Sequence, residues 1–136
     1  MKTMVIYYSY SGHTKLIAEK IAAEESADTV EIKDIDRPGA FKAYTSGCFA
    51  SLKAKTWPIA PIEADFSAYD RLILLSPIWA GRTPPAVNAF LEILPKGKTV
   101  SVKLISGSGK SNCQDLLEGI IKAKGCVAEG FEDIRG

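Results

Sequence analysis

The fold of this chain is decided by residues 4–14, which read MVIYYSYSGHT. Residues 4–8 are continuously apolar, β-branched or aromatic, a pattern typical of a strand buried on both faces of a parallel sheet. Residues 9–14 change to hydroxyl side chains around Gly12. From Lys15 onward, apolar side chains recur at helical spacing. The stretch therefore predicts a buried strand, a short polar loop and the start of a helix.

Strand and helix patterns alternate along the rest of the chain. Apolar strand patterns fall at residues 28–33, 72–75, 99–105 and 126–134, the first of them half-exposed as in an edge strand. Helical patterns begin at residues 15, 40, 83 and 114, and a long connection spans 56–69. Such alternation predicts a single α/β domain over residues 1–136, with a parallel sheet and helices on its faces.

Local signals place the helices more closely. Thr83 is expected to cap the helix over 83–94, with Pro84 at its first position. Ser111 and Gln114 have the spacing of a capping box before the last helix, and the Lys122 to Gly125 region predicts its end. The expected buried stripes of the first and last helices are Leu16, Ile17, Ile21 and Ala22, and Leu116, Leu117, Ile120 and Ile121.

Composition excludes several classes of protein. The 136 residues are 46% hydrophobic and 24% charged, with a net charge of +1, which excludes a disordered or collagen-like chain. The absence of a basic block argues against nucleic acid or an anionic membrane surface as a partner. No apolar run approaches the roughly 20 residues of a membrane-spanning helix, and no signal-peptide pattern starts the chain. We therefore expect a cytoplasmic protein.

The three cysteines, Cys48, Cys113 and Cys126, are widely and irregularly spaced. This spacing suggests neither a disulfide framework nor a zinc site. We expect them to be ordinary core or surface thiols.

Three loops follow the carboxyl ends of predicted buried strands, where open α/β sheets bind ligands. The first is hydroxyl-rich and joins a strand to a helix N-terminus, which suits a phosphate, although Ser11 or Thr14 could simply cap the helix. In the second, Trp79 could stack on a planar ligand or cover the edge of the core. The third is a tight Ser/Gly loop. Their candidate binding residues are Ser9, Tyr10, Ser11, Gly12, His13 and Thr14; Pro77, Ile78, Trp79, Ala80 and Gly81; and Ser106, Gly107, Ser108 and Gly109.

Other site types fail on spacing. The Gly109-Lys110-Ser111 ending imitates a nucleotide-binding P-loop, but the glycine required five residues before Gly109 is replaced by Leu104. The dinucleotide fingerprint is missing after the first strand. His13 is the only histidine, and no catalytic triad or metal-ligand cluster can be assembled around it. We therefore predict no catalytic side chain and no metal.

Taken together, the three loops resemble those of the flavodoxin family, and the resemblance spans nearly the whole chain. It implies a three-layer flavodoxin-like sandwich with a five-stranded parallel sheet of order 2-1-3-4-5. It also implies FMN as cofactor, with the phosphate in the first loop and the ring between the second and third. The chemistry would belong to the flavin.

Three departures from the family pattern shape the expected function. The third loop has no aromatic residue, and Arg82 and Lys110 flank the ring loops, which favours a reductase passing electrons from NAD(P)H to a small acceptor. An electron carrier with a protein redox partner is the close alternative. The pattern of the family's last helix is missing, which predicts a homodimer, or a partner, covering one sheet face, although residues 56–69 could also cover it.

A binding module that kept the fold but lost FMN is the alternative to an oxidoreductase. A response-regulator receiver would need acidic residues after the first and third strands, where this chain has Tyr8-Ser9 and Ser76-Pro77. That class is therefore discounted.

Overall fold

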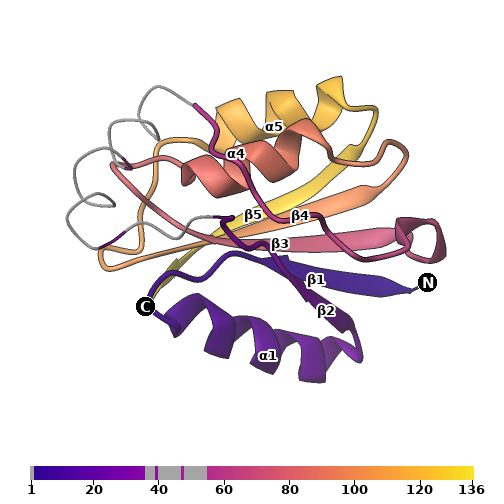
Figure 1. Cartoon of the computed structure of the whole chain (residues 1–136), viewed down its shortest axis with the longest axis horizontal. Coiled ribbons are helices and arrows are strands. Elements are labelled where there is room, and N and C mark those ends of the chain that lie inside the picture. Colours follow the sequence, from indigo (N-terminus) through magenta and orange to yellow (C-terminus); the bar gives the residue numbers. More distant parts are fainter. Residues whose placement is uncertain (1, 36–38, 40–46, 48–54) are drawn as a thin grey trace.

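The computed structural model describes residues 2–35, 39, 47 and 55–136 and forms one parallel sheet with helices on both faces (Figure 1). The helix predicted over 40–55 falls almost wholly outside the described residues. The strand order β2-β1-β3-β4-β5 confirms the prediction. In chain order the elements are β1 (Thr3–Tyr7), α1 (His13–Glu25), β2 (Asp28–Glu31), the 3-10 turn η2 (Phe66–Ala68), β3 (Arg71–Pro77), α4 (Pro85–Glu92), β4 (Thr99–Ser106), α5 (Gln114–Ala123) and β5 (Val127–Arg135).

The centre of the sheet is the pairing of β1 with β3. The two strands run in register from the Thr3–Arg71 pair to the Tyr7–Leu75 pair, and Val5 and Leu75 have no exposed surface. Since both strands have neighbours on each side and helices on both faces, their central positions, residues 4–7 and 72–75, are all buried and apolar. This explains why residues 4–8 lack the alternation of a half-exposed strand.

Helix α1 covers one face of the sheet, and α4 and α5 cover the other (Figure 1). The stripe predicted for α1 is partly wrong, because Leu16 is 68% exposed. The buried residues of the helix are Thr14, Ala18 and Ala22, which bring its backbone close to Val5 and its neighbours in the sheet. Likewise, α5 buries Leu117 and Ile121 but leaves Leu116 40% exposed.

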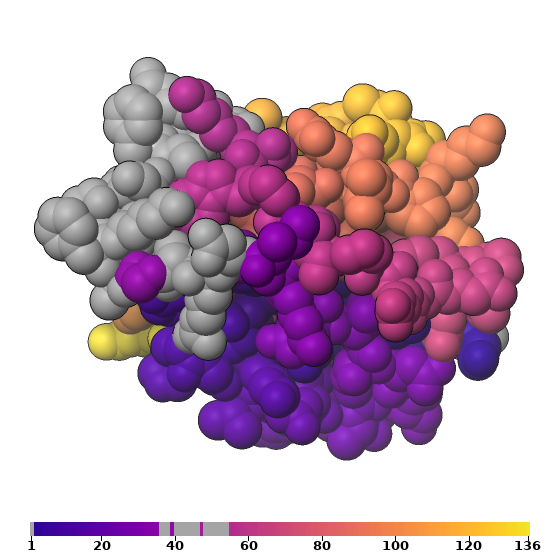
Figure 2. Space-filling model, viewed as in Figure 1, coloured from indigo at the N-terminus to yellow at the C-terminus, as the bar shows by residue number. Residues whose placement is uncertain are grey.

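The connection of residues 57–69 covers the half of the α4 side that lies toward β2. Its Ile59, Ile62 and Phe66 pack against the same core as α4 and α5, and the Ala60 amide donates to the Lys33 carbonyl at 2.8 Å. Figure 2 shows the segment running across the molecule between α1 and the α4–α5 layer. The expectation that it could fold over the other face, beside α1, is therefore wrong.

Two predicted helix caps are replaced by other contacts. Pro84 occupies the cap position of α4 without a side-chain capping bond, and the Thr83 hydroxyl donates to Asn88 Oδ1 at 2.6 Å. At α5 the cap position is Cys113, without a side-chain capping bond. The residues of the predicted capping box both donate to the Asp133 carboxylate instead: Ser111 at 2.7 Å and Gln114 at 3.1 Å. The capping box thus gives way to a link between β5 and the start of α5.

Two cysteines behave as the expected core thiols. Cys113 and Cys126 are buried, and the Cys126 thiol donates to the Pro95 carbonyl at 3.0 Å. Burial is the main reason why the pKa of the Cys113 thiol is raised. Cys48 lies outside the described residues.

The face of the sheet beside α1 is polar where β3, β4 and β5 meet. Arg71 pairs with Glu129 at 2.8 Å, and Lys103 with Glu132 at 2.9 Å. These pairs offer little apolar surface to a partner, so they give no support to hydrophobic association there. The homodimer through this face stays a prediction. In the part of the chain that the structure describes, none of the helices has the length and apolarity to cross a bilayer.

The close packing of α1 leads to the first prediction. Replacing Ala18 by Leu should destabilise the protein by about 1–3 kcal/mol, because the fully buried site has no room for the extra methyl groups. Leu16→Ala, on the exposed side of the same helix, should change the stability by less than about 0.5 kcal/mol. Urea unfolding measures both, and equal losses would show that α1 is packed through a different face.

Candidate functional site

The loops that follow β1, β3 and β4 meet at one end of the sheet. Parallel strands place their carboxyl ends along a single edge, and these three strands are neighbours. Backbone hydrogen bonds between neighbouring strands continue just beyond the strand ends. The Tyr8 amide donates to the Leu75 carbonyl at 3.2 Å, and the Ile78 amide donates to the Ile105 carbonyl at 3.1 Å. The three predicted loops therefore form one contiguous surface.

The first loop is wound around the hydroxyl of Ser9. Its Oγ accepts hydrogen bonds from the amides of Gly12 at 3.0 Å and Lys15 at 3.2 Å. Gly12 occupies the cap position of α1 with φ +100°, a conformation that favours glycine, and nothing lies within 4 Å of where its Cβ would be. Ser11 and His13 are exposed. The result is an open helix N-terminus with hydroxyl side chains beside it.

The second loop reverses direction at a two-residue turn. The amide of Trp79 donates to the Arg82 carbonyl at 2.8 Å, and the amide of Arg82 donates back at 3.0 Å. Ala80 and Gly81 lie between them with φ of +52° and +78°, as a type I′ hairpin turn requires. The side chain of Asn112 lies 2.9 Å from where a Gly81 Cβ would be, so this position has little room for a side chain.

Trp79 is held in a group of aromatic rings. Its ring meets those of Tyr8, Tyr10 and Trp57 edge to face, with centroids 6.1, 5.8 and 6.4 Å apart. A Cβ on Gly47 would come within 2.7 Å of the Trp79 ring. Trp79 therefore packs at the edge of the core, the alternative to ligand stacking that the sequence left open, while part of its surface stays accessible.

The third loop is a turn closed by Ser106. Its hydroxyl accepts the amide of Gly109 at 3.0 Å, and Gly109 has φ +71° with its Cβ position 3.1 Å from Arg135 Cβ. Gly107 and Ser108 are exposed at the tip, and nothing lies within 4 Å of the Cβ position of Gly107. This loop also contacts the second one through the Asn112 amide, which donates to the Gly81 carbonyl at 3.4 Å.

Every predicted site residue except Thr14 is at least partly exposed at this end of the molecule. Thr14 is 3% exposed and belongs to the core beneath the loop. Sequence reasoning missed Trp57 and Asn112, which support the second loop, and Asp34, which accepts a 2.6 Å hydrogen bond from the Tyr8 hydroxyl. These residues come from distant segments, so no local pattern marks them.

The chain is similar to known proteins over most of its length. A family model described as flavodoxin matches residues 2–125. An NAD(P)H dehydrogenase (quinone) of Cupriavidus metallidurans is 33% identical over 94 residues, which cover 67% of this chain and 45% of that protein. A second enzyme of the same description, from Azorhizobium caulinodans, is 31% identical with the same coverage. The chain therefore spans less than half the length of these curated relatives.

Solved structures agree on the fold. A Bacteroides eggerthii protein classed among the flavoproteins superposes with a TM-score of 0.82 at 23% identity, covering 96% of this chain and 86% of that one. A Lactobacillus acidophilus flavoprotein in complex with FMN has a TM-score of 0.76 at 22% identity, covering 96% and 91%. Because the family model matches residues 2–125 of 136 and the sheet has the family's strand order, this chain belongs to the flavodoxin family.

Proposed function

We propose that this chain binds FMN across the three loops and acts as an oxidoreductase that passes electrons from NAD(P)H to a quinone-like acceptor. The observation that carries the proposal is the meeting of the loops at the carboxyl ends of β1, β3 and β4. The strand order reverses between β1 and β3, and such a switch point is where open α/β sheets bind their ligands.

The first loop fits a phosphate group. The amides in the first turn of α1 have no acceptor within the helix, and the helix dipole favours an anion at its N-terminus. Gly12 leaves open space where a side chain would stand, and Ser11 adds an exposed hydroxyl. In this proposal Ser9 shapes the loop through its two amide contacts, while Ser11 and the free amides bind the phosphate.

The second and third loops fit the edges of a planar ring. Their tips, Ala80, Gly107 and Ser108, are exposed and carry only small side chains. Backbone amides and carbonyls can therefore approach the ring, and Trp79 keeps the second loop in place by packing behind it. FMN, when bound, supplies the electron-transfer chemistry. The protein's own contribution is to hold the phosphate, orient the ring and leave one ring face open.

A reductase is favoured over a carrier by two observations. The relatives above that share at least 31% identity are described as NAD(P)H dehydrogenases (quinone). In addition, Lys110 lies beside the third loop and is exposed, so the surface there is not uniformly acidic. Exposed positive charge attracts the phosphates of a nicotinamide nucleotide.

The phosphate assignment leads to the second prediction. Ser11→Ala should weaken FMN binding by about 1–3 kcal/mol, because the hydroxyl donates to a charged group. Quenching of FMN fluorescence measures the affinity. Ser67→Ala, at the opposite end of the sheet, is the matched control and should bind FMN like the unchanged protein. A protein that ignores FMN at micromolar concentrations would instead support the alternative of a binding module.

The third prediction separates reductase from carrier. In a stopped-flow instrument, NADPH mixed with the FMN-loaded protein should bleach the flavin absorbance without any added protein. A quinone added afterwards should restore the absorbance. Flavin that stays oxidised until a separate reductase is added would contradict the proposed donor and make the chain an electron carrier.

The fourth prediction concerns the turn at Ala80. Its left-handed backbone is unfavourable for any residue with a Cβ, so Ala80→Gly should stabilise the protein by about 0.5–1 kcal/mol despite the greater freedom of glycine in the unfolded chain. Ala23→Gly in α1 should do the opposite and cost about 0.5–1 kcal/mol. Thermal unfolding compares the two; a loss of stability in both variants would mean that Ala80 is not strained.

A further inference from the structure

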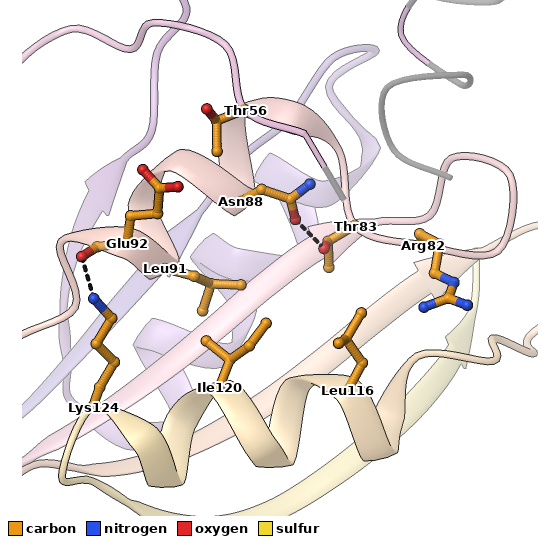
Figure 3. A pocket seen from close by; sticks show the side chains of 9 residues that line it. All are labelled: Thr56, Arg82, Thr83, Asn88, Leu91, Glu92, Leu116, Ile120 and Lys124. Carbon is orange, nitrogen blue, oxygen red and sulfur yellow. Dashed lines mark hydrogen bonds between the residues drawn. The ribbon is translucent and has the colours of Figure 1, made fainter. Parts of the chain in front are cut away.

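A groove lies between α4 and α5, away from the tips of the three loops (Figure 3). Its cavity volume is about 160 Å³, close to that of a cavity known to hold a benzene molecule. Leu91 of α4 and Leu116 and Ile120 of α5 form its apolar lining. Leu116 stands 40% exposed there. The groove is therefore both apolar and open to a ligand.

Arg82 stands at one end of this groove. Its Nε is buried and has no hydrogen-bond partner among the residues that the structure describes. Within that same part of the chain, no carboxylate forms an ion pair with it at 4.0 Å or less. Asp133, beside the start of α5, is already occupied by Ser111 and Gln114. Among the described residues, the guanidinium therefore has no matching anion.

The opposite end of the groove is different. Lys124 donates to the Glu92 carbonyl at 2.6 Å, and the side chain of Glu92 lines the same end (Figure 3). Positive and negative groups are thus both present there. Only at the Arg82 end is a positive charge present without a neighbouring negative group among the described residues. The anionic end of a ligand is therefore expected at Arg82, and its apolar part further along the groove.

We propose that this groove binds a small monoanionic carboxylate whose apolar body is about the size of a benzene ring. The carboxylate accepts hydrogen bonds from the Arg82 guanidinium, whose planar donors match two carboxylate oxygens. The apolar body packs on Leu91, Leu116 and Ile120. An arginine side chain without a carboxylate partner is suited to hold an anion at this end of the groove.

The position of Arg82 gives the groove a connection to the proposed flavin site. Its backbone closes the turn of the second loop through both hydrogen bonds with Trp79. A ligand held by the Arg82 side chain therefore restrains a residue next to the tip that faces the ring. The groove itself involves none of the residues proposed to hold FMN, so it is a separate binding site.

Titration of the FMN-loaded protein with phenylacetate, followed by proton–nitrogen NMR, tests the proposal. Saturable shifts should appear at Leu116 and Ile120, and phenylacetamide, which has the same shape without the charge, should bind about tenfold more weakly. Arg82→Gln should lower the affinity for phenylacetate about tenfold and leave that for phenylacetamide unchanged. Lys110→Gln, outside the groove, is the matched control and should bind phenylacetate normally, and Lys124→Gln, at the other end of the groove, should lose much less affinity than Arg82→Gln.

Two outcomes would overturn the proposal. One is the absence of saturable shifts in the groove; the other is an equal loss of affinity in Arg82→Gln and Lys124→Gln, which would reflect general charge attraction. Leu116→Asn, at a half-exposed site, should weaken both ligands equally and verifies that the apolar lining is used. The titration can be repeated without FMN. The test of the groove therefore does not depend on whether the protein binds FMN as proposed.

Discussion

The pairing of β1 with β3 is the constraint on which the rest of the structure depends. Both strands are buried on two faces, so their register and direction are fixed by apolar contacts above and below the sheet. Since β4 continues the same parallel order, three loops leave the sheet side by side. A slip or reversal of either central strand would separate these loops, and the candidate site would be lost with the core.

The three loops of the candidate site contain backbone conformations with positive φ, which the strands of the core do not need. Gly12, Ala80, Gly81 and Gly109 all have positive φ, and they lie in the three loops at one end of the sheet. For the three glycines this conformation has no steric cost, whereas at Ala80 it persists because the surrounding turn fixes it. Here Ser9, Trp79 and Ser106 supply the fixing contacts from within the loops.

The strand order was expected from the resemblance to the flavodoxin family. The sequence pattern itself was sufficient for the position of the loops, because they follow from uninterrupted apolar runs and from the hydroxyl- and glycine-rich stretches after them. It was not sufficient where residues far apart in the chain decide the outcome. Asp133 draws Ser111 and Gln114 away from a capping box, and close packing of α1 favours Ala18 over Leu16. The contact of Trp57 with Trp79 likewise joins residues far apart in the chain, so the sequence pattern could not predict it.

The central claim is that the three loops together hold FMN, and it can be tested most directly by proton–nitrogen NMR of the isotope-labelled protein during an FMN titration. The account predicts that the largest amide shifts fall in three groups, residues 9–14, 78–82 and 106–110, and saturate together. Shifts confined to one loop, or centred on the opposite end of the sheet near Tyr69, would contradict it.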